Sequence, residues 1–174
     1  MRSAVLAFTL LCLGAAGPAG AQGQGPFGGF KHDNNAPIEI TSDALEVRQA
    51  EERAIFTGEV VAGQGTLRLT ADRVVVHYDA EEQNSQTGAI QRMRAEGNVF
   101  LSNGSETAEG AWAEYDVVGG MMRMGGQVVL TQGENAIAGD ELVINMAEGT
   151  GRIEGREGGR VKSVFTPSSP NADN

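Results

Sequence analysis

The sequence contains few residues that could support redox, disulfide or metal chemistry. Its 174 residues include one cysteine and two histidines. Cys12 lies in the N-terminal segment, and neither His32 nor His77 has Cys, His or carboxylate neighbours at the spacing of metal ligands. We therefore predict no disulfide, no metal site and no cofactor in the mature protein.

Positive charge and aromatic residues are also scarce. The chain has 13 Lys and Arg residues against 23 Asp and Glu residues, a formal net charge of −10. Binding to nucleic-acid phosphates needs Lys and Arg, so nucleic acid is excluded as a partner. Aromatic residues make up 5% of the chain, which argues against a carbohydrate-active enzyme with aromatic sugar platforms and paired acids. We predict that the protein is not an enzyme.

The first 21 residues have the three parts of a secretory signal. Arg2 provides the positive region, and the apolar run from Ala4 to Ala16 is too short to span a membrane. Ala19-Gly20-Ala21 is an A-x-A cleavage site. The sequence therefore predicts a cleaved signal peptide over residues 1–21 and an exported protein that begins at Gln22.

Two further segments have the composition of flexible ends. Residues 22–36 are rich in glycine and predict a flexible N-terminal extension, and residues 168–174 predict a disordered tail. The folded domain is expected between residues 37 and 167.

Within that domain, apolar and polar residues alternate. Ile38 and Ile40, Leu67 and Leu69, and Val74 and Val76 are examples. This period of two is typical of strands with one apolar face and one solvated face. No stretch has a convincing helical period, although residues 44–54 come closest. The fold class is therefore predicted to be all-β.

Two short elements repeat along the chain. One is a small residue followed by Asp and an alternating strand, at Asp43, Asp72 and Asp140, with a weaker copy in residues 109–114. The other is a glycine followed by a strand, at Gly58, Gly97 and Gly126. An Asp side chain can stabilise a bend, and glycine permits a positive φ, so both elements predict corners. A catalytic role for the three Asp residues is a weaker reading than this one.

Repeats of this length indicate stacked β-units that bury their apolar faces against one another. We also expect hairpin turns at residues 63–65, 119–120 and 149–151, and a polar loop over residues 81–88. A last short strand is expected over Val161–Phe165.

Several segments resemble the OstA-like family of lipopolysaccharide-transport proteins. Residues 37–43, 56–60 and 64–76 carry the likeness in the first half, and residues 138–142 and 159–167 in the second. The length and the A-x-A site make the chain most similar to the soluble periplasmic bridge of that family.

The resemblance implies a twisted open β-jellyroll of stacked short antiparallel strands, with an apolar groove that binds the acyl chains of lipid A. It implies a periplasmic lipopolysaccharide carrier that bridges the inner and outer membranes during outer-membrane assembly. Its implied partners are lipopolysaccharide, an inner-membrane OstA-like protein (LptC) and the outer-membrane translocon (LptD), with head-to-tail self-association.

Burying one methylene group is worth roughly 0.8 kcal/mol, so an acyl chain crosses water only at a high free-energy cost. A groove removes that cost without any catalytic residue. The candidate groove residues are the apolar positions expected to face inward: Ile40, Leu45, Val47, Phe56, Leu69, Val76, Val99, Leu101, Trp112, Met122, Met124, Leu130, Leu142 and Ile144. Ordinary core packing is the alternative for each of them.

An open jellyroll leaves unpaired edges that invite strand addition. The expected docking edges are Ile38 and Ile40 at one end and Val161, Val164 and Phe165 at the other. Unlike ends produce a filament rather than a closed dimer. A structural β-solenoid polymer of the cell envelope without lipid cargo would show the same repeats and edges, and the sequence leaves that alternative open.

Overall fold

The computed structural model describes residue 30 and residues 36–79, 89–156 and 159–166. The predicted signal peptide, the loop over residues 81–88 and the tail over residues 168–174 lie outside this part of the chain.

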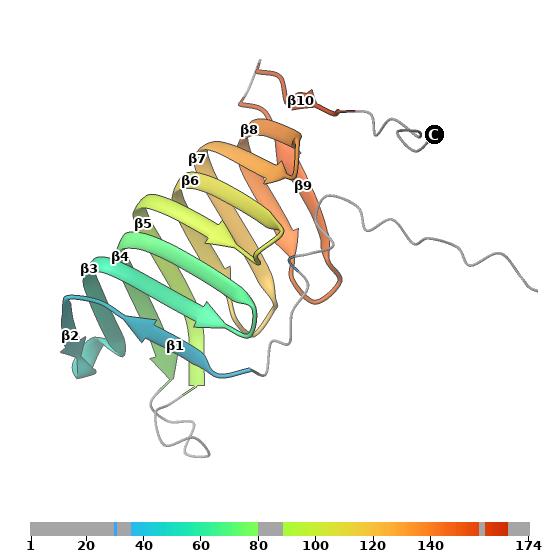
Figure 1. Cartoon of the computed structure of the whole chain (residues 1–174). Helices are drawn as coiled ribbons and strands as arrows, with labels where there is room; N and C mark the ends of the chain where they lie inside the picture. Colours follow the sequence, from blue (N-terminus) through green and yellow to red (C-terminus); the bar gives the residue numbers. More distant parts are fainter. Residues whose placement is uncertain (1–29, 31–35, 80–88, 157–158, 167–174) are drawn as a thin grey trace, which may run out of the picture.

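The described chain is built almost wholly of β-strands, as predicted (Figure 1). The strands are β1 (Ile38–Thr41), β2 (Ala44–Arg48), β3 (Arg53–Gln64), β4 (Leu67–Asp79), β5 (Ala89–Ser102), β6 (Glu106–Asp116), β7 (Met121–Gln132), β8 (Asn135–Asn145), β9 (Thr150–Glu154) and β10 (Lys162–Val164). A single turn of 3-10 helix, Gln49–Glu51, joins β2 to β3.

All these strands belong to one antiparallel sheet in the order β1-β3-β4-β5-β6-β7-β8-β10. β2 pairs with the first half of β3, and β9 pairs with the second half of β8. No pairing joins the two ends of the described sheet, so the prediction of an open all-β architecture is confirmed.

The long strands bend at corners where the pairing register shifts. In β3, β5 and β7 the corner is a pair of residues with positive φ: Gly58–Glu59, Gly97–Asn98 and Gly126–Gln127. Each pair lies at a register shift against the next strand. The predicted glycine corners are therefore confirmed.

The small–Asp elements lie opposite the glycine corners on neighbouring strands. A Cβ atom on Gly58 would collide with the Asp43 carboxylate, and one on Gly97 would collide with Asp72. The backbone N–H of Asp43 donates to the Gly58 carbonyl at 3.0 Å, and Asn98 Nδ2 donates to Asp72 Oδ2 at 2.9 Å. The two repeated elements therefore form the two sides of each of these corners, so Asp43 and Asp72 have the structural role favoured above.

The corners divide the sheet into two walls. The β1–β10 wall contains β1, β10 and the residues 60–64, 67–71, 99–102, 106–110, 128–132 and 135–139 between them. The β2–β9 wall contains β2, β9 and the other halves of the long strands. The bent strands are stacked along one axis (Figure 1).

The core lies between the walls. In the β2–β9 wall, cross-strand partners form an inner row: Leu45, Phe56, Val74, Ala95, Ala113, Met124, Leu142 and Ile153. The corresponding row of the β1–β10 wall is Ile40, Ala62, Leu69, Leu101, Ala108, Leu130 and Ile137. Both rows belong to or pack against one apolar cluster, apart from Leu45 at the outermost position.

Phe30 is one of the two described residues of the predicted N-terminal extension, whose flexibility stays a prediction. Its side chain is 0% exposed and belongs to the core cluster. Burial of a large aromatic side chain stabilises this position, which glycine content alone could not reveal.

Two turns also differ from their predicted positions. The first hairpin turn consists of Gly65 and Thr66, because Gln64 remains paired with Leu67. Residues 150 and 151, which were expected in a turn, begin β9, where Gly151 pairs with Ile144. The last strand is confirmed as β10, which is shorter than the predicted Val161–Phe165.

Candidate apolar groove

The candidate groove residues, apart from Trp112, lie on the inner faces of the two walls. Eight of them are buried: Val76, Val99, Leu101, Met122, Met124, Leu130, Leu142 and Ile144. Ile40, Phe56 and Leu69 are partly buried and pack against this core. The position of these side chains agrees with the predicted alternation, while their contact with lipid stays a prediction.

Trp112 faces the opposite side of the sheet, so its predicted inward position is wrong. It pairs with Glu96 and Gly125, and the Arg94 guanidinium lies over its ring at 5.3 Å from the centroid. The register shifts between Glu109 and Trp112, and a shift of this kind reverses which residues face inward. A Cβ atom at Gly125 would collide with the indole, so this glycine makes room for the ring on the outer face.

The inner apolar surface becomes accessible at the β2 end of the sheet. Leu45 is 55% exposed and Val47 is 60% exposed, although their cross-strand partners Phe56 and Ala54 pack against the core. β2 is an edge strand, so no further strand covers them. The predicted groove residues Leu45 and Val47 therefore lie at an open end and not in the sealed interior.

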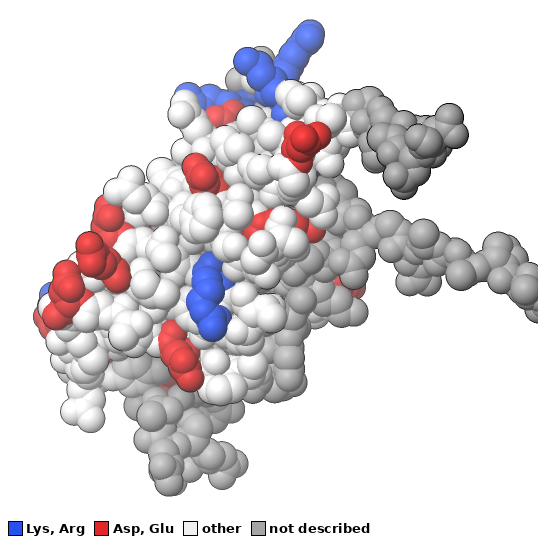
Figure 2. All heavy atoms as spheres, in the orientation of Figure 1, with Lys and Arg blue, Asp and Glu red and all other residues white. Residues whose placement is uncertain are grey.

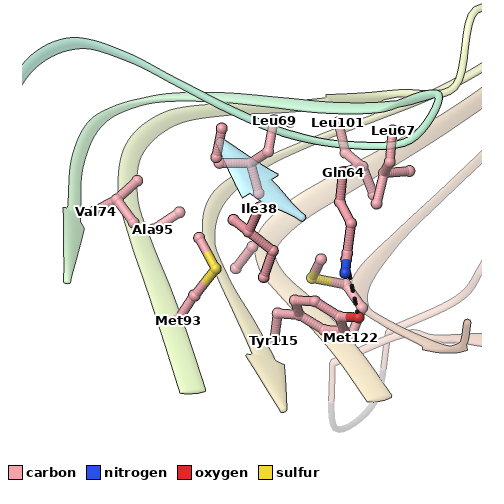
Figure 3. Close-up of a pocket in the computed structure, with 13 residues that line it drawn as sticks. Ile38, Gln64, Leu67, Leu69, Val74, Met93, Ala95, Leu101, Tyr115 and Met122 are labelled. Atoms are coloured by element: carbon pink, nitrogen blue, oxygen red, sulfur yellow. Dashed lines mark hydrogen bonds between the residues drawn. The ribbon is translucent and has the colours of Figure 1, made fainter. Parts of the chain in front are cut away.

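A hollow between the walls opens near β1 (Figure 3). Its empty volume is about 450 Å³, including the part open to solvent. Its lining joins both walls: Ile38, Ala62, Gly63, Gln64, Leu67, Leu69, Val74, Met93, Ala95, Leu101, Ala113, Tyr115 and Met122. Side chains of both walls therefore surround one space whose lining is mostly apolar.

Sequence reasoning identified Leu69, Leu101 and Met122 in this lining but missed most of the others. The sequence predicts Ile38 only as part of a docking edge and Val74 only as part of an alternating strand. Met93 and Tyr115 follow the same period of two as their neighbours Ala95 and Ala113. Extending the alternation through every strand would have found them.

Gln64 and Tyr115 contribute the polar side chains of this lining. The Tyr115 hydroxyl donates to Gln64 Oε1 at 3.3 Å, and Gln64 Nε2 donates to the Ala36 carbonyl at 2.9 Å. Burial raises the pKa of the Tyr115 phenol above its ordinary value, and nearby Asp116 adds to the shift. The phenol therefore remains a neutral hydrogen-bond donor at physiological pH.

Both ends of the described sheet have edge strands, as predicted. β1 and β2 form one end, and β9 and β10 form the other. At the second end Val161 is 42%, Val164 63% and Phe165 62% exposed. Ile38 and Ile40 of β1 are partly buried against the core. The predicted edges are therefore present in the fold, together with β2 and β9, which the sequence did not indicate as edges.

The outer face of the β2–β9 wall has a ladder of ion pairs. Arg73 and Arg94 bond to Glu96 at 3.1 Å and 2.9 Å, and Arg94 also lies 3.4 Å from Glu114. The Arg94 guanidinium lowers the pKa of the Glu96 carboxyl, and Arg73 adds to this effect. Further along the wall Arg123 Nε donates to Glu141 Oε1 at 3.0 Å.

The outer face of the β1–β10 wall has fewer charged side chains than the ion-pair ladder of the β2–β9 wall. In Figure 2, which has the orientation of Figure 1, most of the visible surface lacks charged side chains. Val61 and Val129 of this wall are each 39% exposed.

Among the residues that the structure describes, no three His, Cys, Asp or Glu side chains are grouped to hold a metal ion. No helix in that same part of the chain is long and apolar enough to cross a membrane.

Comparison with known proteins agrees with this architecture. Residues 39–150 match the family described as LptA/(LptD N-terminal domain) LPS transport protein. The crystal structure of LptH from Pseudomonas aeruginosa, described as the LptA homologous periplasmic component of the lipopolysaccharide transport device, superposes with a TM-score of 0.66 at 21% identity. The superposition covers 78% of this chain and 99% of LptH, which shows that the two share a fold.

Curated relatives give the same result. An uncharacterized protein of Rhizobium meliloti is 35% identical over 144 residues, which are 81% of this chain and 77% of that protein. The lipopolysaccharide export system protein LptA of Escherichia coli K12 is 26% identical, over 78% of this chain and 74% of LptA. The LPS-assembly protein LptD of Neisseria meningitidis is 32% identical over 60% of this chain, but over only 13% of its own length. The chain therefore belongs to the LptA/LptD N-terminal domain family of LPS transport proteins, as an LptA-like member.

Proposed function

We propose that this protein is a periplasmic carrier that holds the acyl chains of lipopolysaccharide between its two walls and bridges the inner and outer membranes. A role in LPS transport follows from the family. The observation that supports the finer proposal is the apolar hollow between the walls, together with inner-face residues that become exposed at the end of the sheet.

The physical reason is the cost of moving hydrocarbon through water. Each methylene that stays in apolar contact is worth roughly 0.8 kcal/mol, so an acyl chain passes more easily between apolar surfaces than through solvent. Leu45 and Val47 extend the inner apolar surface to the edge strand, where a second protein of the same fold could continue it.

The edge strands are the proposed docking sites for partners. β1 and β2 at one end, and β9 and β10 at the other, have backbone groups on which another chain could add a strand. The proposed partners are an inner-membrane OstA-like protein, the outer-membrane translocon and further copies of this chain. Because the two ends differ, self-association would be head-to-tail.

The test is to measure binding of purified lipopolysaccharide to the protein by native mass spectrometry, with a matched pair of variants. Leu69 lines the hollow, and Thr70 is the next residue on the outer face. We expect saturable binding that Leu69→Gln weakens and Thr70→Gln leaves unchanged.

Absence of binding by the folded wild type would contradict the carrier function. If that protein still formed filaments, the structural polymer without lipid cargo would be the better interpretation, because exposed edges at both ends suit either function.

A further inference from the structure

A polar pair inside the hollow is not needed for contact with hydrocarbon. Gln64 is 5% exposed and Tyr115 is 6% exposed, and both line a hollow whose other side chains are apolar or absent. A buried polar group lowers stability unless it is hydrogen-bonded, so an apolar pair would be the simpler choice for packing alone.

The second buried polar group that the structure describes, Glu106, has a different setting. Its carboxylate accepts hydrogen bonds from Gln132 Nε2 at 2.7 Å and from Asn103 Nδ2 at 3.3 Å. Glu106 does not line the hollow. The polar pair of Gln64 and Tyr115 is therefore the one that an enclosed chain would meet.

The hydrogen bond that joins the two side chains of the pair is long. The bond between the Tyr115 hydroxyl and Gln64 Oε1 is 3.3 Å long, beyond the usual 2.5–3.0 Å range of O–H···O bonds, and is therefore weak. By contrast, the Gln64 amide nitrogen is fixed to the Ala36 carbonyl at 2.9 Å. Figure 3 shows the Tyr115 hydroxyl and the Gln64 side-chain tip meeting in the hollow.

A ligand hydroxyl group can both accept a hydrogen bond and donate one, and the pair can form a bond of each kind with it. The Tyr115 hydroxyl oxygen and Gln64 Oε1 are 3.3 Å apart. A ligand oxygen can therefore lie at an ordinary hydrogen-bond length, about 2.8 Å, from both of them while the two side chains move little. The Tyr115 hydroxyl would then donate to the ligand oxygen, and the ligand hydroxyl would donate to Gln64 Oε1. A plain hydrocarbon chain offers neither partner.

We propose that Gln64 and Tyr115 form a subsite for the hydroxyl group of a hydroxylated acyl chain, and so select such chains over unsubstituted ones. This inference rests on the proposed function, because it concerns a chain bound in the same hollow. The pair acts as a specificity determinant and not as the source of affinity, which comes from the apolar lining.

The experiment compares two probes in each protein. A saturated long-chain fatty acid and its 3-hydroxy derivative are titrated separately against the purified protein, by displacement of a fluorescent fatty acid. The ratio of the two dissociation constants is the readout, since a variant that merely loosens the hollow changes both constants together.

We expect the wild type to prefer the hydroxylated probe by roughly two- to tenfold, the net contribution of a hydrogen bond. Tyr115→Phe and Gln64→Met each remove one half of the subsite and should bring the ratio close to one. Two variants are used so that Gln64→Met still decides the question if Tyr115→Phe fails to fold.

Tyr78→Phe is the matched control, because Tyr78 is the other tyrosine of the chain and does not line the hollow. Its ratio should equal that of the wild type.

The outcomes separate the two proposals. If the wild type binds both probes equally, or if Tyr115→Phe and Gln64→Met keep the preference, the subsite is wrong and the carrier function stands. If the wild type binds neither probe, nor lipopolysaccharide, the carrier function fails and the subsite fails with it.

Discussion

The inner and outer faces of the β2–β9 wall use the same strands for different purposes. The inner row contains Ala113, Met124 and Leu142, which are almost completely buried. The outer face one residue away contains Glu114, Arg123 and other charged residues in partly exposed ion pairs. Burial of apolar surface dominates stability, whereas exposed ion pairs contribute little, so the inner face should determine whether the fold exists. The predictions below test this contrast, from the largest expected effect to the smallest.

The largest effect is expected from a charge placed on the inner face. Met124 is 0% exposed, and Met124→Asp should lower the free energy of unfolding by on the order of 5 kcal/mol, since it removes apolar contacts and buries a carboxylate. Arg123→Met, at the neighbouring outer position, should change it far less, because solvent screens this exposed ion pair. Urea unfolding of both variants measures this difference, and equal losses would contradict the contrast between the two faces.

Phe30 extends the comparison to the N-terminal extension. Because its side chain is fully buried in the core cluster, Phe30→Ala should lower the free energy of unfolding by about 3 kcal/mol. Phe100, which is partly buried on the outer face beside Thr70, is the control and should lose less when changed to Ala. Thermal unfolding of the two variants would show whether Phe30 is part of the core, and a smaller loss for Phe30→Ala would rule this out.

The corners connect the two walls, so they should tolerate side chains poorly. Gly97 has φ +78°, and a Cβ atom there would collide with the Asp72 carboxylate. Gly104 has φ +97° but has open space around it. Gly97→Ala should therefore cost about 2 kcal/mol and Gly104→Ala about 1 kcal/mol, because only the first adds a collision to backbone strain. Urea unfolding of the two variants measures this difference. If their unfolding curves coincide, the Asp72 side chain moves away from the added Cβ atom without a loss of stability.

The smallest effect is expected on the outer ion-pair ladder. Arg94 lowers the pKa of Glu96 from its ordinary value of 4.5, so the pair stabilises the fold above that pH and loses its effect as the pH falls below it. The Glu96 side chain is 43% exposed and solvent screens the pair, so Glu96→Gln should cost less than about 1 kcal/mol at neutral pH. Urea unfolding at neutral pH and at pH 3 tests the sign: the difference from wild type should shrink at the lower pH, and a difference that grows there would contradict it.

Much of the fold could be predicted because its information is local. Strand alternation depends on neighbouring residues, and it placed Leu69, Leu101 and Met124 on the inner face. The glycines that predict the corners also lie in short segments, and Gly58 and Gly97 adopt the positive φ that glycine allows.

The errors share a different cause. Trp112 follows a register shift, and its face depends on how β6 pairs with β7. The alternating pattern also could not predict which inner-face side chains are exposed to solvent. Leu45 and Leu142 occupy equivalent positions in one row, but only Leu45 lies on an edge strand.

The sequence by itself determined the strand pattern and the corners of this protein, because each depends on residues that are neighbours in the chain. Only the tertiary structure decided which apolar positions are sealed, that Phe30 joins the core, and that Gln64 meets Tyr115. That contact joins residues 51 positions apart, and it exists because bent strands bring the two walls together around one interior.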